Sequence, residues 1–297
     1  MAENLFLHFL KFLRNSGSLL SLGGRFTLPQ SLLRRLFRYS TANVCVDDFD
    51  GGLKVWLSLS EHMQRRIFWM GYYSNDIIRL LDCILKPGMV VVDVGANIGE
   101  ISMVAARRVG VSGKVVSFEP VTAIANQLTD HVNINNLSQI IVVRKALGHF
   151  AREHIPIYAS CGQNVSDENH GLASLYGEGQ GSSVIDYVTM TTLDSTLSEL
   201  TIDRIDLLKI DIEGGELPCL KGAEQLLRRC HPMIIVEVQG FSAKKAGWSV
   251  DELFSYLEGF GYEFFTIGKK GRLARLSPTA VTEFQNVFCR IPRQQVE

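Results

Sequence analysis

The chain has 297 residues, of which 46% are hydrophobic and 21% are charged, and it contains 26 glycines and 8 prolines. This composition excludes a disordered, collagen-like or low-complexity chain, and the length allows one large domain or two smaller ones. Because 30 basic residues oppose 31 acidic ones, the net charge of -1 gives no general attraction for nucleic acid or for an anionic membrane. The 6 cysteines occur singly, without a C-x-x-C pair, which predicts reduced thiols in a cytosolic protein.

The first 75 residues are predicted to form an N-terminal extension. Over residues 1–45, leucine and phenylalanine alternate with arginine, which predicts amphipathic helices packed on their own domain. The same basic stretch is compatible with peripheral contact to a membrane surface or a partner. Apolar residues then alternate from Leu53 to Leu59, behind an Asp50-Gly51 turn, which predicts a strand hairpin. Without a secretory pattern or the ~18 uninterrupted apolar residues of a membrane span, we expect a soluble, cytoplasmic protein.

From residue 76 to residue 297, strand and helix patterns alternate. This alternation predicts an α/β domain with a doubly wound, mostly parallel sheet of the Rossmann-like kind. A capping box, Ser249 with Glu252, predicts the start of a late helix. The rhythm breaks over residues 148–188, a glycine-rich segment that we expect to be an irregular substrate-binding loop. The expected strands cover residues 89–94, 115–118, 140–143, 206–212, 233–238, 262–267 and 284–291.

The clearest ligand motif is Asp93-Val94-Gly95-Ala96-Asn97-Ile98-Gly99, where a buried strand turns into a helix. Small residues let the backbone pass close to a ligand, and the helix start offers unpaired N–H groups. The spacing is neither that of a dinucleotide fingerprint nor that of a P-loop. Asp93 is placed either to bind a ligand ammonium or to organise the loop. Glu119 ends the next strand, where an acidic side chain commonly binds the ribose hydroxyls of a nucleoside.

These motifs and a block later in the chain resemble the FkbM family of class I S-adenosylmethionine-dependent methyltransferases. The block is Lys209-Ile210-Asp211-Ile212-Glu213-Gly214-Gly215-Glu216, which is similar to the family signature K-x-D-x-E-G-x-E. Phe118-Glu119-Pro120 and Lys86-Pro87-Gly88 also fit, so the resemblance spans residues 70–240 in the right order and leaves out residues 1–50.

The resemblance implies S-adenosylmethionine as the methyl donor, bound at the carboxyl ends of the first strands. It places the ribose at Glu119. It places the adenine beside Ala146 and Leu147, which we expect to end the third strand. The residues implied to face the methionine portion are Asp93, Gly95, Asn97 and Gly99.

Acidic residues gather at the ends of the fourth and fifth predicted strands. Asp211, Glu213 and Glu237 are candidate catalytic residues, and Glu216 is a candidate substrate-binding residue. An acceptor hydroxyl must lose its proton as its oxygen attacks, so a carboxylate here could act as general base. Two or three carboxylates could instead bind Mg²⁺, which we favour less. A structural role is the third alternative, in which Glu216 complements a helix N-terminus and Asp211 fixes the loop.

Two features of the glycine-rich segment add further candidates. Ser174 belongs to a small-residue stretch, 171–175, that is similar to one found before the signature in the family, so we expect it to contact the acceptor. The histidines His149, His154 and His170 are alternative bases, because an imidazole titrates near neutral pH.

The sequence therefore predicts an O-methyltransferase acting on a hydroxyl of a small molecule or sugar, within a glycan, glycolipid or natural product, and not on nucleic acid. The preference for a sugar rests on the family resemblance alone. One alternative is N-methylation or methylation of a protein. Amine-directed enzymes often carry Asn/Asp-Pro-Pro-aromatic after the fourth strand, where this chain has Asp211-Ile212-Glu213-Gly214. The other alternative is a non-catalytic nucleoside-binding protein, against which the acidic residues argue. The oligomeric state is left open.

Overall fold

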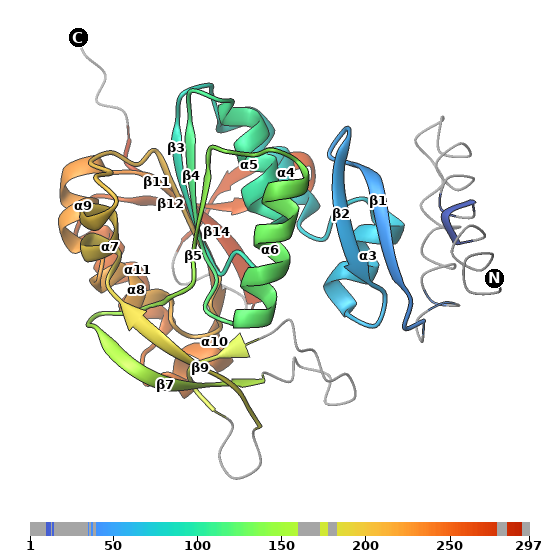
Figure 1. The fold of residues 1–297 in the computed structure, drawn as a ribbon. Coiled ribbons are helices and arrows are strands. Elements are labelled where there is room, and N and C mark those ends of the chain that lie inside the picture. The colour runs from blue at the N-terminus through green and yellow to red at the C-terminus, as the bar shows by residue number, and fades with distance from the viewer. Residues whose placement is uncertain are drawn as a thin grey trace. The chain divides into compact units, whose positions relative to one another are not determined.

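The computed structural model describes residues 10–12, 14, 35, 37, 40–159, 173–177, 183–277 and 284–292. It divides into two compact units, Met1–Ser74 and Asn75–Glu297 (Figure 1). The helices predicted over residues 1–45 lie mostly outside the described residues. Within the described part of the chain, no helix combines the length and the apolar character that crossing a bilayer requires.

The first unit contains the predicted hairpin, β1 (Asn43–Phe49) paired antiparallel with β2 (Leu53–Ser58). Every second residue of β2 is buried, so the hairpin has one apolar face, as the alternation predicted. Helix α3 (His62–Met70) follows and buries Phe68 and Trp69 completely or nearly so. The N-terminal hairpin extension is thereby confirmed.

The second unit is built on an eight-stranded sheet with the order β13-β12-β14-β11-β10-β3-β4-β5. Five neighbouring strands, β11, β10, β3, β4 and β5, pair in parallel. Strand β14 is antiparallel to both β11 and β12. The predicted α/β fold with a mostly parallel sheet is confirmed. The strands are β3 (Val90–Val94), β4 (Lys114–Phe118), β5 (Ile140–Val143), β10 (Leu207–Ile210), β11 (Met233–Gln239), β12 (Glu263–Ile267), β13 (Leu273–Arg275) and β14 (Phe284–Arg290).

Helices cover both faces of this sheet, as a doubly wound fold requires. Figure 1 shows α4, α5 and α6 on one face and α7, α8, α9 and α11 on the other. The predicted capping box is present at the start of α11, where the side chains of Ser249 and Glu252 each accept the other's backbone N–H. The helices are α4 (Asn75–Ile84), α5 (Glu100–Val109), α6 (Thr122–Ile134), α7 (Leu193–Glu199), α8 (Glu216–Lys221), α9 (Glu224–Cys230), α10 (Gly240–Lys245), α11 (Val250–Glu258) and the short 3-10 helix η1 (Lys269–Gly271).

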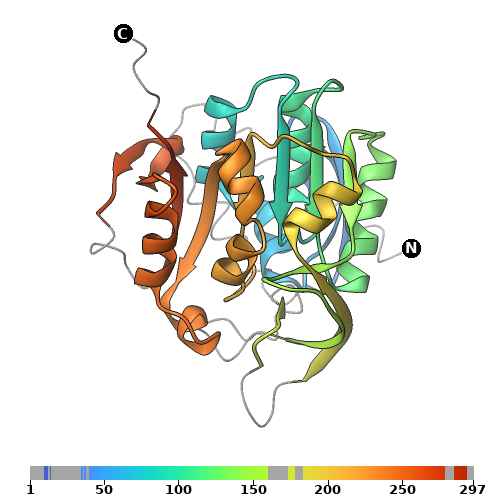
Figure 2. The same cartoon turned by 90° about the vertical axis from the view of Figure 1, so that its left-hand side faces the viewer.

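A second, four-stranded sheet occupies the segment that was expected to be irregular. Its order is β6-β9-β7-β8, from β6 (Ala146–Leu147), β7 (Arg152–Ala159), β8 (Ala173–Ser174) and β9 (Val184–Thr191). The described parts of residues 148–188 are therefore largely strand, and the expectation of irregular chain was wrong for them. Their apolar side chains do pack together, with Ile157 buried against Val188. In Figures 1 and 2 this sheet lies below the main sheet, at the edge where β3 and β4 end.

The same finding corrects the expected end of the third strand. That strand, β5, ends at Val143, and Ala146 with Leu147 forms the separate strand β6, which pairs with β9. The charged pair Arg144-Lys145 separates the two apolar stretches, so the chain leaves one sheet and enters the other there.

Candidate active site

The predicted site residues converge at the carboxyl ends of β3, β4, β10 and β11. Parallel strands direct these ends to one edge of a sheet, which is where ligands bind in open α/β folds. The register pairs Ile210 with Val94 and with Val236, so the loops that follow β3 and β10 start side by side, next to Glu237 of β11.

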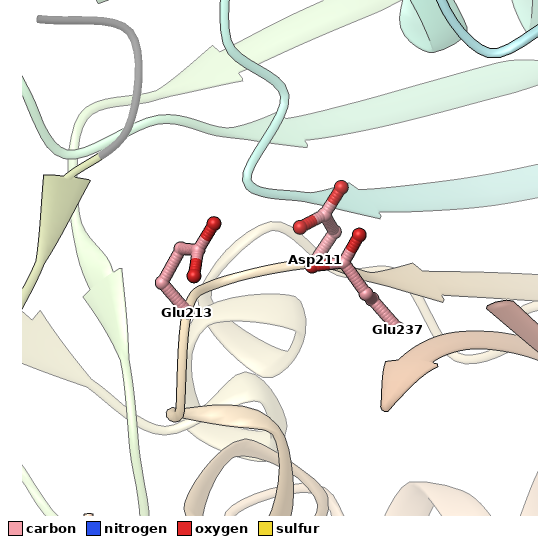
Figure 3. Close-up of side chains that lie close together, drawn as sticks. All are labelled: Asp211, Glu213 and Glu237. Atoms are coloured by element: carbon pink, nitrogen blue, oxygen red, sulfur yellow. The ribbon is translucent and has the colours of Figure 1, made fainter. Parts of the chain in front are cut away.

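Three carboxyl groups meet at this edge, and we call Asp211, Glu213 and Glu237 the acid cluster. One carboxylate oxygen from each lies within 4.8 Å of the others, as the close-up shows (Figure 3). Asp211 and Glu213 come from the loop after β10, in which Glu213 adopts a left-handed φ of 50°. Oxygen ligands at this spacing are of the type that hard cations prefer. The geometry brings together all three residues that were predicted to be catalytic.

Burial and mutual repulsion change the proton affinity of the acid cluster. Burial raises the pKa of Glu213 to about 7, and the nearby charge of Asp211 adds to this effect. The pKa of Glu237 lies well above its usual range, first because the side chain is buried and then because Asp211 and Glu213 face it. Carboxyl groups with raised pKa values can hold or accept a proton near neutral pH, which suits general acid–base chemistry.

A buried lysine, Lys209, lies between the acid cluster and the glycine loop. Its Nζ atom is 3.7 Å from Oδ2 of Asp211 and 3.3 Å from Oδ1 of Asp93. Burial alone would lower the pKa of Lys209, but the two aspartates outweigh burial and raise it, so the side chain is an ammonium. Lys209 belongs to the signature block, but its place in the sequence indicates no role for it. The only signal available was a lysine inside an otherwise apolar strand.

Asp93 lies in β3, two residues before Gly95, and has no exposed surface. Its Oδ2 accepts a 2.6 Å hydrogen bond from Ser102, and Ser102 in turn accepts one from Ser117. With Lys209 on its other oxygen, Asp93 faces protein on every side. This geometry favours the organising role that the sequence allowed, and it does not support direct contact of Asp93 with the methionine portion of the donor.

The glycines of the loop are required by close packing. Gly95 has a φ of +73°, and a Cβ atom there would overlap the backbone oxygen of Asp211. Gly99 has a φ of +96° and precedes α5, and a Cβ there would overlap Leu128 of α6. Asn97, also left-handed with a φ of 50°, accepts the N–H of Ile98 through its own side chain. The N–H groups of Gly95 and Ala96 bond to the backbone oxygen of Phe118, so the loop is held in one shape ahead of α5.

Glu119 follows β4 and turns its carboxylate toward the glycine loop. One oxygen accepts the N–H of Asn97 and the other accepts the N–H of Val121, both at 3.0 Å. Burial raises the pKa of Glu119 to about 7, although these two bonds lower it. A carboxylate offers about four acceptor positions, and the two bonds occupy only two. Glu119 therefore retains acceptor capacity for a pair of ribose hydroxyls and fits a nucleoside donor.

Glu216 is placed differently from the expectation that it contacts substrate. The residue is 4% exposed, and its carboxylate accepts the N–H groups of Ile212 and Gly214, in the loop that carries the acid cluster. Burial raises its pKa to about 7. These contacts favour the structural alternative, in which Glu216 shapes the loop before α8.

Ser174 also contacts the loop of the acid cluster. Its hydroxyl donates to the backbone oxygen of Glu213 at 2.9 Å and accepts the N–H of Tyr176. Trp248 donates to the backbone oxygen of the next residue, Gly214, at 2.7 Å. Ser174 of the second sheet and Trp248 after α10 thus both hold the loop in place. The Ser174 hydroxyl, which was expected to contact the acceptor, is bonded to protein groups.

The remaining candidates lie away from the acid cluster. Ala146 and Leu147 are buried, at 5% and 3% exposure, in two different hydrophobic clusters. His149 and His154 are exposed, and the ring of His154 stacks on Tyr187 with 4.4 Å between ring centres. His170 lies outside the described residues. The two described histidines are therefore not part of the carboxylate site.

Comparison with known families decides what kind of domain carries this site. Residues 93–264, more than half of the chain, match the family model described as the methyltransferase FkbM domain. The chain belongs to this family. The predicted family is confirmed, and with it an S-adenosylmethionine-dependent methyltransferase domain.

The individual relatives are distant in sequence. The AMB antimetabolite synthetase AmbE of Pseudomonas aeruginosa is 28% identical over 236 residues, which cover 70% of this chain and 11% of that protein. Methyltransferase 1 of Beauveria bassiana is 28% identical over 149 residues, covering 45% of this chain and 58% of that protein. The chain thus spans less than two thirds of the length of these curated relatives. The crystal structure of methyltransferase FkbM from Methylobacillus flagellatus KT aligns with a TM-score of 0.44 and 15% identity, covering 77% of this chain and 53% of that one.

Proposed function

We propose that the protein transfers a methyl group from S-adenosylmethionine to a hydroxyl oxygen of a small molecule or sugar. The observation that carries the proposal is the packing of the acid cluster against the glycine loop. Gly95 and the backbone of Asp211 approach so closely that no side chain fits between them. A proton acceptor therefore lies next to the loop at which the family holds its donor.

The donor would be held by the glycine loop and by Glu119. The loop carries no side chain at Gly95 and Gly99, so its backbone can lie close to a ligand, and the Glu119 carboxylate has acceptor capacity for the ribose hydroxyls. Beside them, Ala146 and Leu147 remain the proposed border of the adenine. When bound, the donor supplies an electrophilic methyl group on a sulfonium. The chain's own task is to hold the acceptor oxygen in line with that methyl and to remove its proton.

Asp211 is the proposed general base. Its side chain is 36% exposed, whereas Glu237 is 9% exposed, so an incoming acceptor reaches Asp211 first. As the new oxygen–carbon bond forms, the acceptor hydroxyl gives its proton to the Asp211 carboxylate. The electron pair of the broken carbon–sulfur bond stays on sulfur, so charge and atoms balance. Glu213 and Glu237, whose pKa values are raised, can pass the proton onward.

Electrostatics favour a hydroxyl acceptor over an amine. An amine attacks through its lone pair, but nearby carboxylates raise the pKa of an amine and keep it as an ammonium without that pair. A divalent cation is disfavoured for a related reason, because the Lys209 ammonium already lies 3.7 Å from Asp211. A neutral hydroxyl is neither held in a protonated, unreactive form by the carboxylates nor repelled by the Lys209 ammonium.

The test is donor binding followed by methyl transfer to a panel of acceptors. Calorimetry should detect S-adenosylmethionine or its demethylated product, and NAD should bind negligibly. Isotope-labelled donor should then label sugars or small hydroxylated molecules, and not amines, peptides or RNA in the same panel. Tight NAD binding without donor binding would remove the donor assignment. Labelling of amines alone would replace the O-methyltransferase with an N-methyltransferase, and donor binding with no transfer across the panel would favour a non-catalytic protein.

A further inference from the structure

Lys209 is the least expected residue of the central sheet. It lies in β10, in which all four residues are buried and the other three, Leu207, Leu208 and Ile210, are apolar. Moving an ammonium out of water is unfavourable unless its new partners compensate for the lost hydration. An apolar residue at this position would fit the buried strand without a desolvation penalty. The lysine therefore has a role other than forming the sheet.

The ammonium of Lys209 bridges the glycine loop and the acid cluster. It donates to the backbone oxygens of Val94 and Gly95, at 3.3 Å and 3.0 Å. The same Nζ atom lies 3.3 Å from Asp93 and 3.7 Å from Asp211. Its side chain is only 6% exposed, so water does little to screen these interactions. One buried charge thus contacts both the donor loop and the proposed base.

We propose that Lys209 is a positioning residue that ties the base Asp211 to the donor loop and orients its carboxylate. This inference rests on the proposed function, in which Asp211 removes the acceptor proton. Lys209 contacts neither the donor nor the acceptor in this role. Through the carbonyls of Val94 and Gly95 it fixes the loop, and through its charge it fixes the carboxylate of Asp211.

The charge of Lys209 matters because Asp211 is surrounded by acids. Crowded carboxyl groups cannot all ionise without a compensating cation. Without Lys209, its buried cation would no longer offset the repulsion within the cluster, and the already raised pKa of Glu237 would rise further, so activity would begin at a higher pH. The groups facing the cluster are Asp93 of β3, Lys209 of β10, Glu213 of the following loop, Glu216 of α8, Glu237 of β11 and Lys245 of α10, which faces Glu213.

Three variants of the full chain separate positioning from simple structure. Lys209→Met removes the charge at similar volume, and Lys209→Arg keeps it. Lys245→Met is the matched control, because Lys245 lies near Glu213 but does not bridge the two loops. Should Lys209→Met fail to fold, the double variant Asp93→Asn/Lys209→Met removes both charges of the buried pair, a change that is often neutral for stability.

The first readout needs no turnover. Amide hydrogen exchange of Gly95, Ala96 and Asp211, which are bonded to Phe118 and Val94, should accelerate about tenfold or more in Lys209→Met. Exchange in helix α11 should stay unchanged, and so should all of these rates in Lys245→Met. Unchanged exchange at both loops overturns the proposed tie, whatever the activity of the protein.

The second readout is the pH profile of kcat. In Lys209→Met the acid limb should move to higher pH and kcat at neutral pH should fall about 10- to 100-fold. In Lys209→Arg, which keeps the positive charge, the acid limb of the kcat profile should lie close to that of the unmutated chain. A uniform loss at every pH, with the limb in place, means that Lys209 is structural and overturns the electrostatic role. If the unmutated chain methylates no hydroxyl, the proposed function fails, while the exchange rates still decide whether Lys209 ties the loops.

Discussion

Gly95 and Asp211 meet backbone to backbone, and a Cβ atom on Gly95 would overlap the carbonyl oxygen of Asp211. The loop after β3 and the loop after β10 are therefore in direct contact at the carboxyl edge of the sheet. One loop carries the proposed donor motif and the other carries the acid cluster, and they can lie this close only because Gly95 has no side chain. This contact makes Gly95 a test of the whole arrangement.

Gly95→Ala should destabilise the protein and abolish donor binding. The variant suffers both the left-handed strain of about 1–2 kcal/mol and the overlap with Asp211. Gly261→Ala is the control, because Gly261 has a positive φ of +85° but open space around it. It should lower Tm slightly and leave donor affinity intact. Equal losses in the two variants, measured by thermal unfolding and calorimetry, would contradict the proposed contact.

Asp211→Asn should lower turnover about 10²–10⁴-fold while donor affinity stays near that of the unmutated chain. The amide keeps the shape of the carboxylate but cannot accept the proton. A chelator should leave the unmutated enzyme active. Loss of activity with chelator, restored by Mg²⁺, would instead assign the cluster to a metal, and normal turnover of Asp211→Asn would refute the base.

Glu119→Ala should weaken the binding of S-adenosylmethionine. Hydrogen bonds to a charged carboxylate contribute roughly 1.5–3 kcal/mol, so the Kd should rise about 10- to 150-fold. Glu153→Ala removes an exposed carboxylate on β7 that accepts a hydrogen bond from Thr189 on β9, and this variant should leave the Kd unchanged. Titration calorimetry at one pH compares the three proteins directly. An unchanged Kd in Glu119→Ala would exclude the ribose contact.

The stability of the protein should fall as pH rises toward neutrality. Burial raises the pKa of Glu119, Glu213 and Glu216 to about 7 in the folded chain. The unfolded value is about 4.3, so the folded state binds more protons between these limits. The stabilising contribution is therefore complete below the unfolded pKa and is lost as pH rises through about 7. Urea unfolding of Glu213→Gln over this window should show a smaller slope than the unmutated chain, and an equal slope would contradict the shift for Glu213.

Trp248→Phe should separate loop support from general stability. It removes the indole bond to Gly214 and should cost about 1–3 kcal/mol, because a buried acceptor is left without its donor. Tyr262→Phe removes a comparable 2.8 Å bond to Pro232, at the far end of β11. Both variants should lower Tm, but only Trp248→Phe should lower kcat. A kcat that falls equally in both would mean that stability alone limits activity.

Much of the molecule could be predicted from the sequence because its signals are local. Apolar runs predicted the central strands, and the Ser249 and Glu252 pair predicted the start of α11. The second sheet was missed because its strands give weak local signals: β6 and β8 have 2 residues each, and β7 begins with exposed polar residues at Arg152, Glu153 and His154. Glycines and polar residues between them hide the strand period, so only the paired backbone reveals it.

The sequence by itself determined the family, the glycine loop and the acidic residues beside the strand ends. Only the tertiary structure decided what each acid does. Glu237 reaches Asp211 from a neighbouring strand, whereas Glu216 turns back to bind the N–H of Gly214. The physical reason is that the role of a carboxyl group depends on the donors and charges around it, and these come from distant parts of the chain. Lys209 and Val94 are 115 residues apart, yet their hydrogen bond joins the two loops on which the proposed reaction depends.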